Sequence, residues 1–212
     1  MLVDMSSQPR EPASAKPSAA HGSDRELRAD ARRNRERVLR TAQQVFATEG
    51  LGVSLDEIAR RAGVGPGTVH RHFPAKEALY LAVAADQLQQ LVTQAKALAA
   101  TDDPEAALLT LFSRMMATGA ENAAVKSALA AAEFDLRTAD PGVAAVLTRH
   151  VADLLNRAQA VGGVRDDLTA EELMALLAGA LAAIRHAGAE TSRERSAHIV
   201  QIILDGLRPQ PR

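Results

Sequence analysis

Residues 54–76, SLDEIARRAGVGPGTVHRHFPAK, predict two short helices joined by a glycine turn, with a third helix directly after them. Ser54 is suited to N-cap the first helix, and Glu57, three residues later, completes a capping-box pattern. Gly63 occupies the turn, where the chain needs a residue that tolerates a positive φ. Pro66 opens the second helix at its first turn, where its missing N–H is not needed. This spacing is typical of a helix-turn-helix.

The second helix of this pair is about two turns long, which is too short to be stable by itself. Val69 and Phe73 are spaced to bury one side of it, while the other side carries threonine, histidine and arginine. A short polar helix held in this way fits the major groove of DNA, where side chains near the helix N-terminus meet the base edges. The stretch therefore predicts a DNA-reading motif.

The segment from about residue 35 to residue 79 resembles the N-terminal domain of the TetR family of transcriptional regulators. Its first helix, VLRTAQQVFATEG at 38–50, ends in an aromatic residue and a glycine. The IA..AGV turn follows, the recognition helix ends in HF, and a lysine starts the next helix. The resemblance implies an all-α fold, in which a three-helix helix-turn-helix DNA-binding domain precedes a helical-bundle domain for ligand binding and dimerisation. It covers roughly a quarter of the chain, and the remainder is similar only in its helical pattern and length.

The composition fits this fold class. Of the 212 residues, 47% are hydrophobic, and alanine and leucine, which favour helices, are abundant. No run of about 18 apolar residues suggests a membrane span, and the absence of cysteine excludes disulfides and thiolate sites. We expect a disordered N-terminal arm at 1–24, a DNA-binding domain at 25–75 and a regulatory domain at 76–208. The arm lacks the apolar segment of a secretory signal, so we expect a cytoplasmic protein that binds no membrane.

Charge is distributed unevenly along the chain. Ten basic and five acidic residues between Arg28 and Lys76 give that segment a net charge of +5, against −1 for the whole chain. A basic reading domain on an acidic body is attracted to DNA through counterion release. The arginines from 28 to 40, with Arg35 among them, fit contacts with phosphate or the minor groove, although an arginine run can also be a solvated helix face.

Positions within the motif suggest individual roles. Thr68 and Pro66 lie near the start of the recognition helix and are expected to contact base edges, while Gly67 allows close approach. His70 stands where the TetR family usually has tyrosine, so an imidazole must replace the phosphate contact of the tyrosine or read a base. Phosphate contacts are expected from the remaining polar positions: Ser54, Arg71, His72 and Lys76. For Ser54, helix capping alone is an equally good explanation.

Two other interpretations of these residues fail. Gly63, Gly65 and Gly67 follow no strand and precede no Gly-Lys-Ser/Thr sequence, so they do not form a phosphate-binding loop. His70 and His72 are two residues apart on a helix, so they point about 200° from each other and cannot converge on one metal ion. We therefore expect neither a metal nor a cofactor.

The chain beyond residue 76 reads as a series of amphipathic helices. They are expected at 76–100, from 103, at 123–138, at 140–162, from 169 and at 193–207. Four apolar side chains could line an effector cavity, with His150 as an orienting polar group: Phe112, Met115, Met116 and Phe134. Each of them also fits an ordinary core or surface position.

The last two helices carry wide apolar stripes, and in the family that this chain resembles such helices form a homodimer interface. We expect that interface to include Leu177, Leu181, Ile184, Ile199 and Ile203. The alternative is that these residues form the core of a single chain. Two readers on a two-fold axis would bind a palindromic operator, with half-sites about one DNA turn or more apart.

We therefore predict a sequence-specific DNA-binding regulator, a repressor by its resemblance to the family, that is released by an unidentified small-molecule effector. The alternative is a helical dimeric interaction protein whose DNA reader is degenerate. An enzyme would need a nucleophile–base pair or a metal cluster. Asp102-Asp103 and Asp166-Asp167 look like loop and cap residues, so we expect no catalytic residue.

Overall fold

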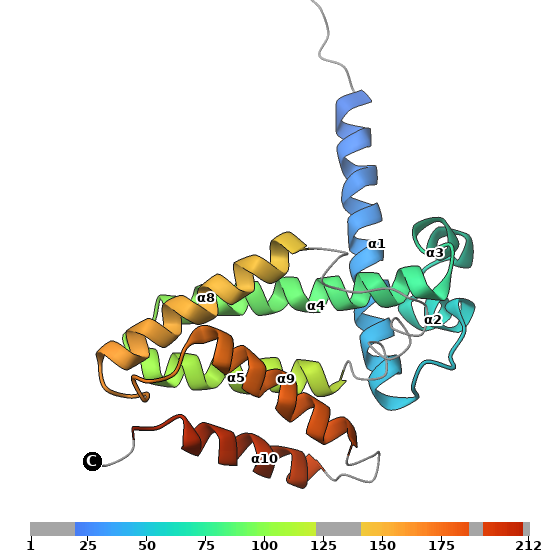
Figure 1. Cartoon of the computed structure of the whole chain (residues 1–212). Helices are drawn as coiled ribbons and strands as arrows, with labels where there is room; N and C mark the ends of the chain where they lie inside the picture. The colour runs from blue at the N-terminus through green and yellow to red at the C-terminus, as the bar shows by residue number, and fades with distance from the viewer. Residues whose placement is uncertain (1–19, 122–140, 187–192, 210–212) are drawn as a thin grey trace, which may run out of the picture.

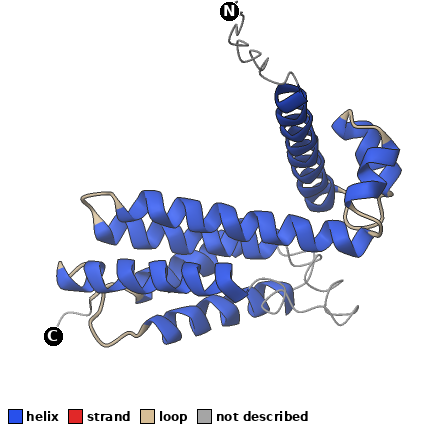
Figure 2. Ribbon diagram, turned by 90° about the horizontal axis from the view of Figure 1, so that it is seen from above, coloured by secondary structure: helices blue, strands red, loops and turns tan. Residues whose placement is uncertain are grey.

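The computed structural model describes residues 20–121, 141–186 and 193–209, and every regular element within these ranges is a helix. The all-α prediction is therefore confirmed for the part of the chain that the structure describes (Figures 1 and 2). The helices are α1 (Ala20–Thr48), α2 (Leu55–Ala62), α3 (Pro66–His72), α4 (Lys76–Ala99), α5 (Pro104–Glu121), α8 (Pro141–Ala160), α9 (Ala170–His186) and α10 (Arg193–Gly206). The helix expected at 123–138 lies outside the described residues.

Helices α1 to α3 and the start of α4 enclose the smaller of two hydrophobic cores. The side of α1 from Val38 to Phe46 packs there with apolar residues of α2 and with Val69 and Phe73. Helix α1 begins at Ala20, so it includes the last five residues of the segment that the sequence assigned to a disordered arm. Its N-terminal half projects beyond the rest of the molecule in both views (Figures 1 and 2).

Helices α4, α5, α8, α9 and α10 enclose the larger core. Leu108, Leu111, Leu154 and Leu173 are among its most deeply buried side chains. Helix α4 belongs to both cores: Leu79 packs in the smaller one, and Val92, further along the same helix, packs in the larger one. The two groups of helices are thus joined by one continuous helix.

In the larger domain, α5 and α9 begin where the capping residues in the sequence predicted a helix N-terminus. Asp103 Oδ1 accepts the N–H of Ala106 at 2.9 Å, which caps α5. At the start of α9, Thr169 Oγ1 accepts the N–H of Glu172 at 3.2 Å, and Glu172 Oε2 accepts the N–H of Thr169 at 2.8 Å. This is the predicted capping box, and its hydrogen bonds from Thr169 lower the pKa of Glu172.

Burial of α3 can be tested with a matched pair of variants. Val69→Ala should lower the free energy of unfolding by about 2 kcal/mol, because it removes two buried methyl groups and leaves a cavity. The control is Val161→Ala, since that side chain is 64% exposed; its effect should stay within about 0.5 kcal/mol. Urea denaturation of both variants measures the difference, and equal losses would contradict the burial of α3.

Candidate nucleic-acid interface

Helix α2 starts at a polar cap. Ser54 has extended backbone angles, and its Oγ accepts the N–H of Glu57 at 3.2 Å, as predicted. The Glu57 carboxylate does not complete the expected capping box. It accepts hydrogen bonds from Arg60 Nε at 2.8 Å and from Arg61 Nε at 2.7 Å. Two guanidinium donors outcompete one backbone amide for this carboxylate because charge-assisted hydrogen bonds are stronger than neutral ones.

A further ion pair, between Arg61 and Glu49, connects α2 to the residue that follows α1. Arg61 also donates through Nη2 to Glu49 Oε2 at 3.0 Å, so one guanidinium bridges Glu49 and Glu57. The hydrogen bonds from Arg60 and then Arg61 lower the pKa of Glu57 to about 2. The hydrogen bond from Arg61 likewise lowers the pKa of Glu49.

The turn between α2 and α3 sets the angle of the recognition helix. Gly63 adopts φ +62°, the left-handed conformation that the sequence predicted for this position. Its N–H donates to Arg60 O at 3.2 Å, and the N–H of Val64 donates to Ala59 O at 3.0 Å. This pair of hydrogen bonds is a Schellman motif, and the buried Val64 side chain completes it. Pro66 then begins α3.

Helix α3 presents one face to the core and the other to solvent. Val69 is 1% exposed and Phe73, directly after the helix, is 2% exposed. The residues predicted to contact DNA lie on the outer side: Pro66, Gly67, His70, Arg71 and His72 are exposed, and Thr68 is half-buried. The helix is therefore anchored by two apolar side chains and exposes its polar residues on the opposite face. Helix α3 itself lies at the edge of the molecule (Figure 1).

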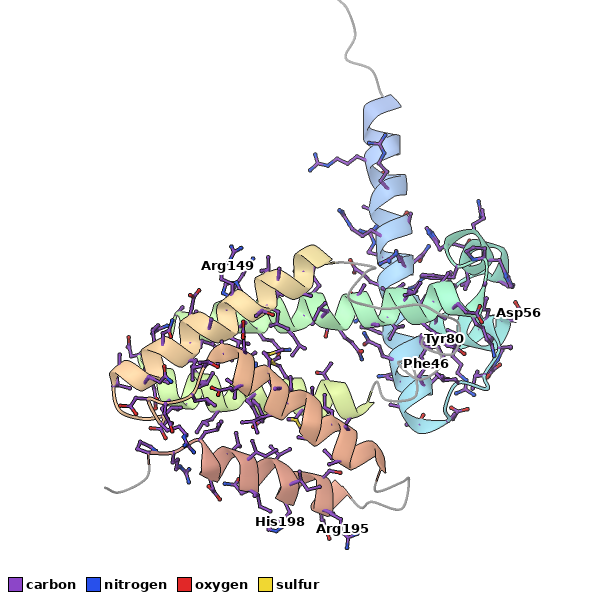
Figure 3. All side chains as sticks on the ribbon, in the orientation of Figure 1. Phe46, Asp56, Tyr80, Arg149, Arg195 and His198 are labelled. Carbon is purple, nitrogen blue, oxygen red and sulfur yellow. The ribbon has the colours of Figure 1, made fainter. Side chains whose placement is uncertain are left out.

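Several of these outer side chains contact other protein groups. His70 Nε2 lies 2.9 Å from Asp56 Oδ1, which links α3 to α2. Arg71 Nε donates to the Gly67 carbonyl at 3.1 Å. Asp56 is labelled in Figure 3. Nothing in the sequence singled it out, because an acid in the first turn of a helix is already explained by its favourable interaction with the helix N-terminus.

Arg35 lies against the recognition element from α1. Its guanidinium carbon is 5.8 Å from the centre of the Phe73 ring, within cation–π range. Further toward the N-terminus, α1 carries exposed arginines at 25, 32 and 33, and Val38 is the first residue of this helix in the core. Glu26 and Asp30 are exposed on the same half of the helix and Arg33 pairs with Asp30, so the excess of positive charge there is small.

Lys76, at the start of α4, holds the loop between α1 and α2. Its Nζ donates to the carbonyls of Leu51 at 3.3 Å and Gly52 at 3.2 Å, and Tyr80 Oη donates to Leu51 O at 3.0 Å. Burial raises the pKa of Tyr80, and its ring packs edge-on against Phe46 (Figure 3). This supporting role of Lys76 was not predicted.

The effector-cavity residues proposed from the sequence lie in different environments. Phe112, Met115 and Met116 are buried in the larger core, and His150 is half-buried on α8. Phe134 lies outside the described residues. Burial is compatible both with a cavity lining and with ordinary core, so the role of these three side chains stays a prediction.

The residues predicted for the dimer interface differ in exposure, and their role there stays a prediction. Leu177 and Leu181 are each 7% exposed and pack in the core of their own chain. Ile184, Ile199 and Ile203 are half-buried. Among the described residues, Leu176 on α9, 43% exposed, and Ile202 on α10, 57% exposed, are the large apolar side chains that these helices present outward. A wide apolar stripe covers more than one face, so the sequence did not show which part faces the core.

The geometry defines a class of protein: a helix-turn-helix DNA-binding protein with a second, larger helical domain. A profile described as "Bacterial regulatory proteins, tetR family" matches residues 38–83. Another, described as "Transcriptional regulator SbtR-like, C-terminal domain", matches residues 103–209.

Solved structures agree with this assignment. A TetR transcription regulatory protein from Mycobacterium vanbaalenii is 43% identical, and the match covers 86% of this chain and 99% of that one, with a TM-score of 0.70. A TetR transcriptional regulator from Streptomyces coelicolor is 30% identical over 84% and 99% of the two chains, with a TM-score of 0.67. The chain belongs to the TetR family of transcriptional regulators.

A curated relative matches over a shorter stretch. An HTH-type transcriptional regulator of Staphylococcus aureus is 38% identical over 71 residues, which are 33% of this chain and 38% of that protein. Within the described ranges, no helix combines the length and the apolar character that a bilayer crossing requires. The same part of the chain contains no group of three or more histidine, aspartate or glutamate residues placed to bind a metal ion.

The ion pairs of Glu57 predict a pH dependence. Because the folded state lowers the pKa of Glu57 from its ordinary value of 4.5 to about 2, this carboxylate stabilises the fold above pH 4.5, and the contribution is lost as the pH falls toward 2. Glu57→Gln should therefore reduce the loss of stability between these pH values. Thermal unfolding across this range measures the effect, with Glu171→Gln on the exposed first turn of α9 as the control. Parallel curves for the three proteins would contradict the prediction.

Proposed function

We propose that this chain is a DNA-binding repressor that acts as a homodimer on a palindromic operator and is released by a small molecule. The observation that supports it most is the outward face of α3, which displays Thr68, His70 and Arg71 while Val69 and Phe73 anchor the helix. A helix held in this way can enter the major groove, with Pro66, Gly67 and Thr68 nearest the base edges. Residues 25–75 would form the reading domain and residues 76–208 the regulatory domain.

Phosphate binding is assigned to the residues around α3. Arg71 and His72 are exposed at the C-terminal end of α3, and Arg35 lies beside it on α1. Lys76 donates to two loop carbonyls through Nζ at more than 3 Å, so its ammonium can exchange one of these for a phosphate oxygen. The exposed Ser54 would add a contact at the start of α2.

The dimer interface is assigned to the outer faces of α9 and α10. Leu176 and Ile202 are exposed in the single chain. Burying a large apolar side chain is favourable by about 1.5–3 kcal/mol. A second copy of the chain would cover these side chains and place the two readers on a two-fold axis. We assign the protein to the cytoplasm, where it would meet both DNA and an unidentified small-molecule effector.

The roles of the DNA-reading residues can be separated by binding assays. Thr68→Ala and His70→Ala should relax sequence preference, because each removes a side chain expected at the bases. Lys76→Ala should weaken binding to all sequences alike and reduce the salt slope by about one. Selection from a random duplex pool followed by titration at several salt concentrations measures both effects.

The control for Lys76 is Lys96→Ala, an exposed lysine in the last turn of the same helix, which should change neither quantity. The same response from Thr68→Ala and Lys76→Ala would contradict the division of roles. If the selection recovers no inverted repeat, and the affinity for DNA does not change with salt concentration, an interaction protein with a degenerate reader is favoured instead.

The dimer can be tested with charged substitutions. Ile202→Asp should shift the protein to the monomer, because a buried unpaired carboxylate opposes association. Val161→Asp, at a 64% exposed position in the loop after α8 and outside the two interface helices, should remain dimeric. Light scattering after size-exclusion chromatography measures the mass. A wild-type monomer, or a dimeric Ile202→Asp variant, would contradict the proposed interface.

A further inference from the structure

A cavity of 310 Å³ lies where α1, α4 and α5 meet. Its volume is at the lower end of the range of about 300–1,000 Å³ that is typical of small-molecule sites. Six uncharged residues supply its polar groups: Gln43 and Gln44 from α1, Gln87, Gln90 and Gln94 from α4, and Thr118 from α5. This set is unusual for a junction between helices, which is normally filled by apolar side chains.

The strongest sign that the cavity binds a ligand is the side chain of Gln87. Its Oε1 atom is buried and has no hydrogen-bond partner among the described residues. A buried amide oxygen without a donor is costly, and such atoms are rare in folded proteins. A rotation of the Gln87 side chain would turn this oxygen toward the cavity that the residue lines, where an N–H or O–H group of a bound molecule would satisfy it.

Two neighbouring glutamines are already oriented by an acid. Gln43 Nε2 donates to Asp86 Oδ2 at 3.1 Å, and Gln90 Nε2 donates to the same oxygen at 2.7 Å. Each of these amides thus uses a hydrogen on Asp86, which leaves the oxygens of Gln43 and Gln90, like that of Gln87, as acceptors. The Asp86 carboxylate disfavours an anion beside Gln43 and Gln90, whereas Arg114 donates to Gln94 Oε1 at 3.3 Å and places a positive charge beside that residue.

The wall of the cavity nearest the cores is apolar. Phe46, Val83 and Leu91 line it and are 6%, 1% and 7% exposed. Gln44, Ala47 and Gln90 are exposed, so they form the outer rim. A fitting molecule needs one apolar face and hydrogen-bond donors along an edge.

We propose that this cavity binds a compact, uncharged ring compound that carries amide or hydroxyl donors. The site borders both cores, through Phe46 and Val83 on one side and Leu91 on the other, and is not lined by Phe112, Met115 or Met116. The binding claim depends on the cavity alone.

Its consequence for regulation rests on the proposed DNA-binding function. Gln43 and Asp86 join α1 of the reading domain to α4, which continues into the larger core. A ligand donor that competes with Gln43 and Gln90 for Asp86 Oδ2 would alter how α1 sits on α4. DNA affinity should then fall by about fivefold or more, the lower end of typical allosteric coupling.

Nicotinamide and uridine are the probes, and nicotinate is the charged counterpart of the first. We expect nicotinamide to shift the Gln87 side-chain amide signal in NMR spectra of the full chain, and nicotinate to bind more weakly. Gln87→Leu should weaken nicotinamide binding about threefold to tenfold, the effect of one hydrogen bond. Gln89→Leu, an exposed position two residues along α4, should leave it unchanged. Ala47→Met fills the cavity from its rim and should abolish binding without removing a hydrogen bond.

The outcomes separate the two claims. If neither probe shifts the Gln87 signal, if an ordered water alone satisfies Gln87, or if Gln87→Leu and Gln89→Leu respond alike, the site is refuted. If nicotinamide binds and the protein recognises no DNA, the site stands and the proposed function fails. If both bind without affecting each other, the regulatory consequence is refuted.

Discussion

Helix α4 is the constraint on which the rest of the structure depends, because it belongs to both hydrophobic cores. Leu79 and Val83 are buried with the helix-turn-helix, while Val92 and Ala95 on the same helix are buried with α5 and α8. Packed cores resist small deformations, so a displacement of α4 in the larger core must move its N-terminal end as well. That end carries Lys76, which holds the loop between α1 and α2. A packing change in one domain thus has a direct path to the other.

Within the reading domain, apolar anchoring outweighs the visible ion pairs. Val69 and Phe73 are almost fully buried, and burial of such side chains contributes about 1.5–3 kcal/mol each. The pairs between Glu57 and Arg60 or Arg61 are open to solvent, which screens their attraction, so they contribute little to stability. The ion pairs therefore refine the orientation of α2, whereas hydrophobic contacts hold α3 in place.

Local signals were readable from the sequence because they span only a few residues. The Ser54 cap, the Gly63 turn and the Thr169 capping box each follow from chemistry within one helical turn. The spacing of apolar residues reveals a helix only where one of its faces is buried. It therefore did not reveal the start of α1 at Ala20, which lies well before the core residue Val38. It also could not tell which part of the α9 stripe faces the core.

The cavity at the α1–α4 junction had no sequence signature at all. Its polar groups come from segments far apart in the chain, and each glutamine alone reads as a solvated helix residue.

The replacement of the usual tyrosine by His70 changes the electrostatics of the reading surface rather than its fold. His70 and Asp56 are 49% and 71% exposed, so their contact is weak, and a DNA phosphate could displace the imidazole from it. Displacement would leave the Asp56 carboxylate facing a phosphate of the same charge. His70 therefore serves the proposed function better by staying beside Asp56 and shielding it, with the exposed part of its ring toward the bases, which leaves phosphate binding to Arg71 and Lys76.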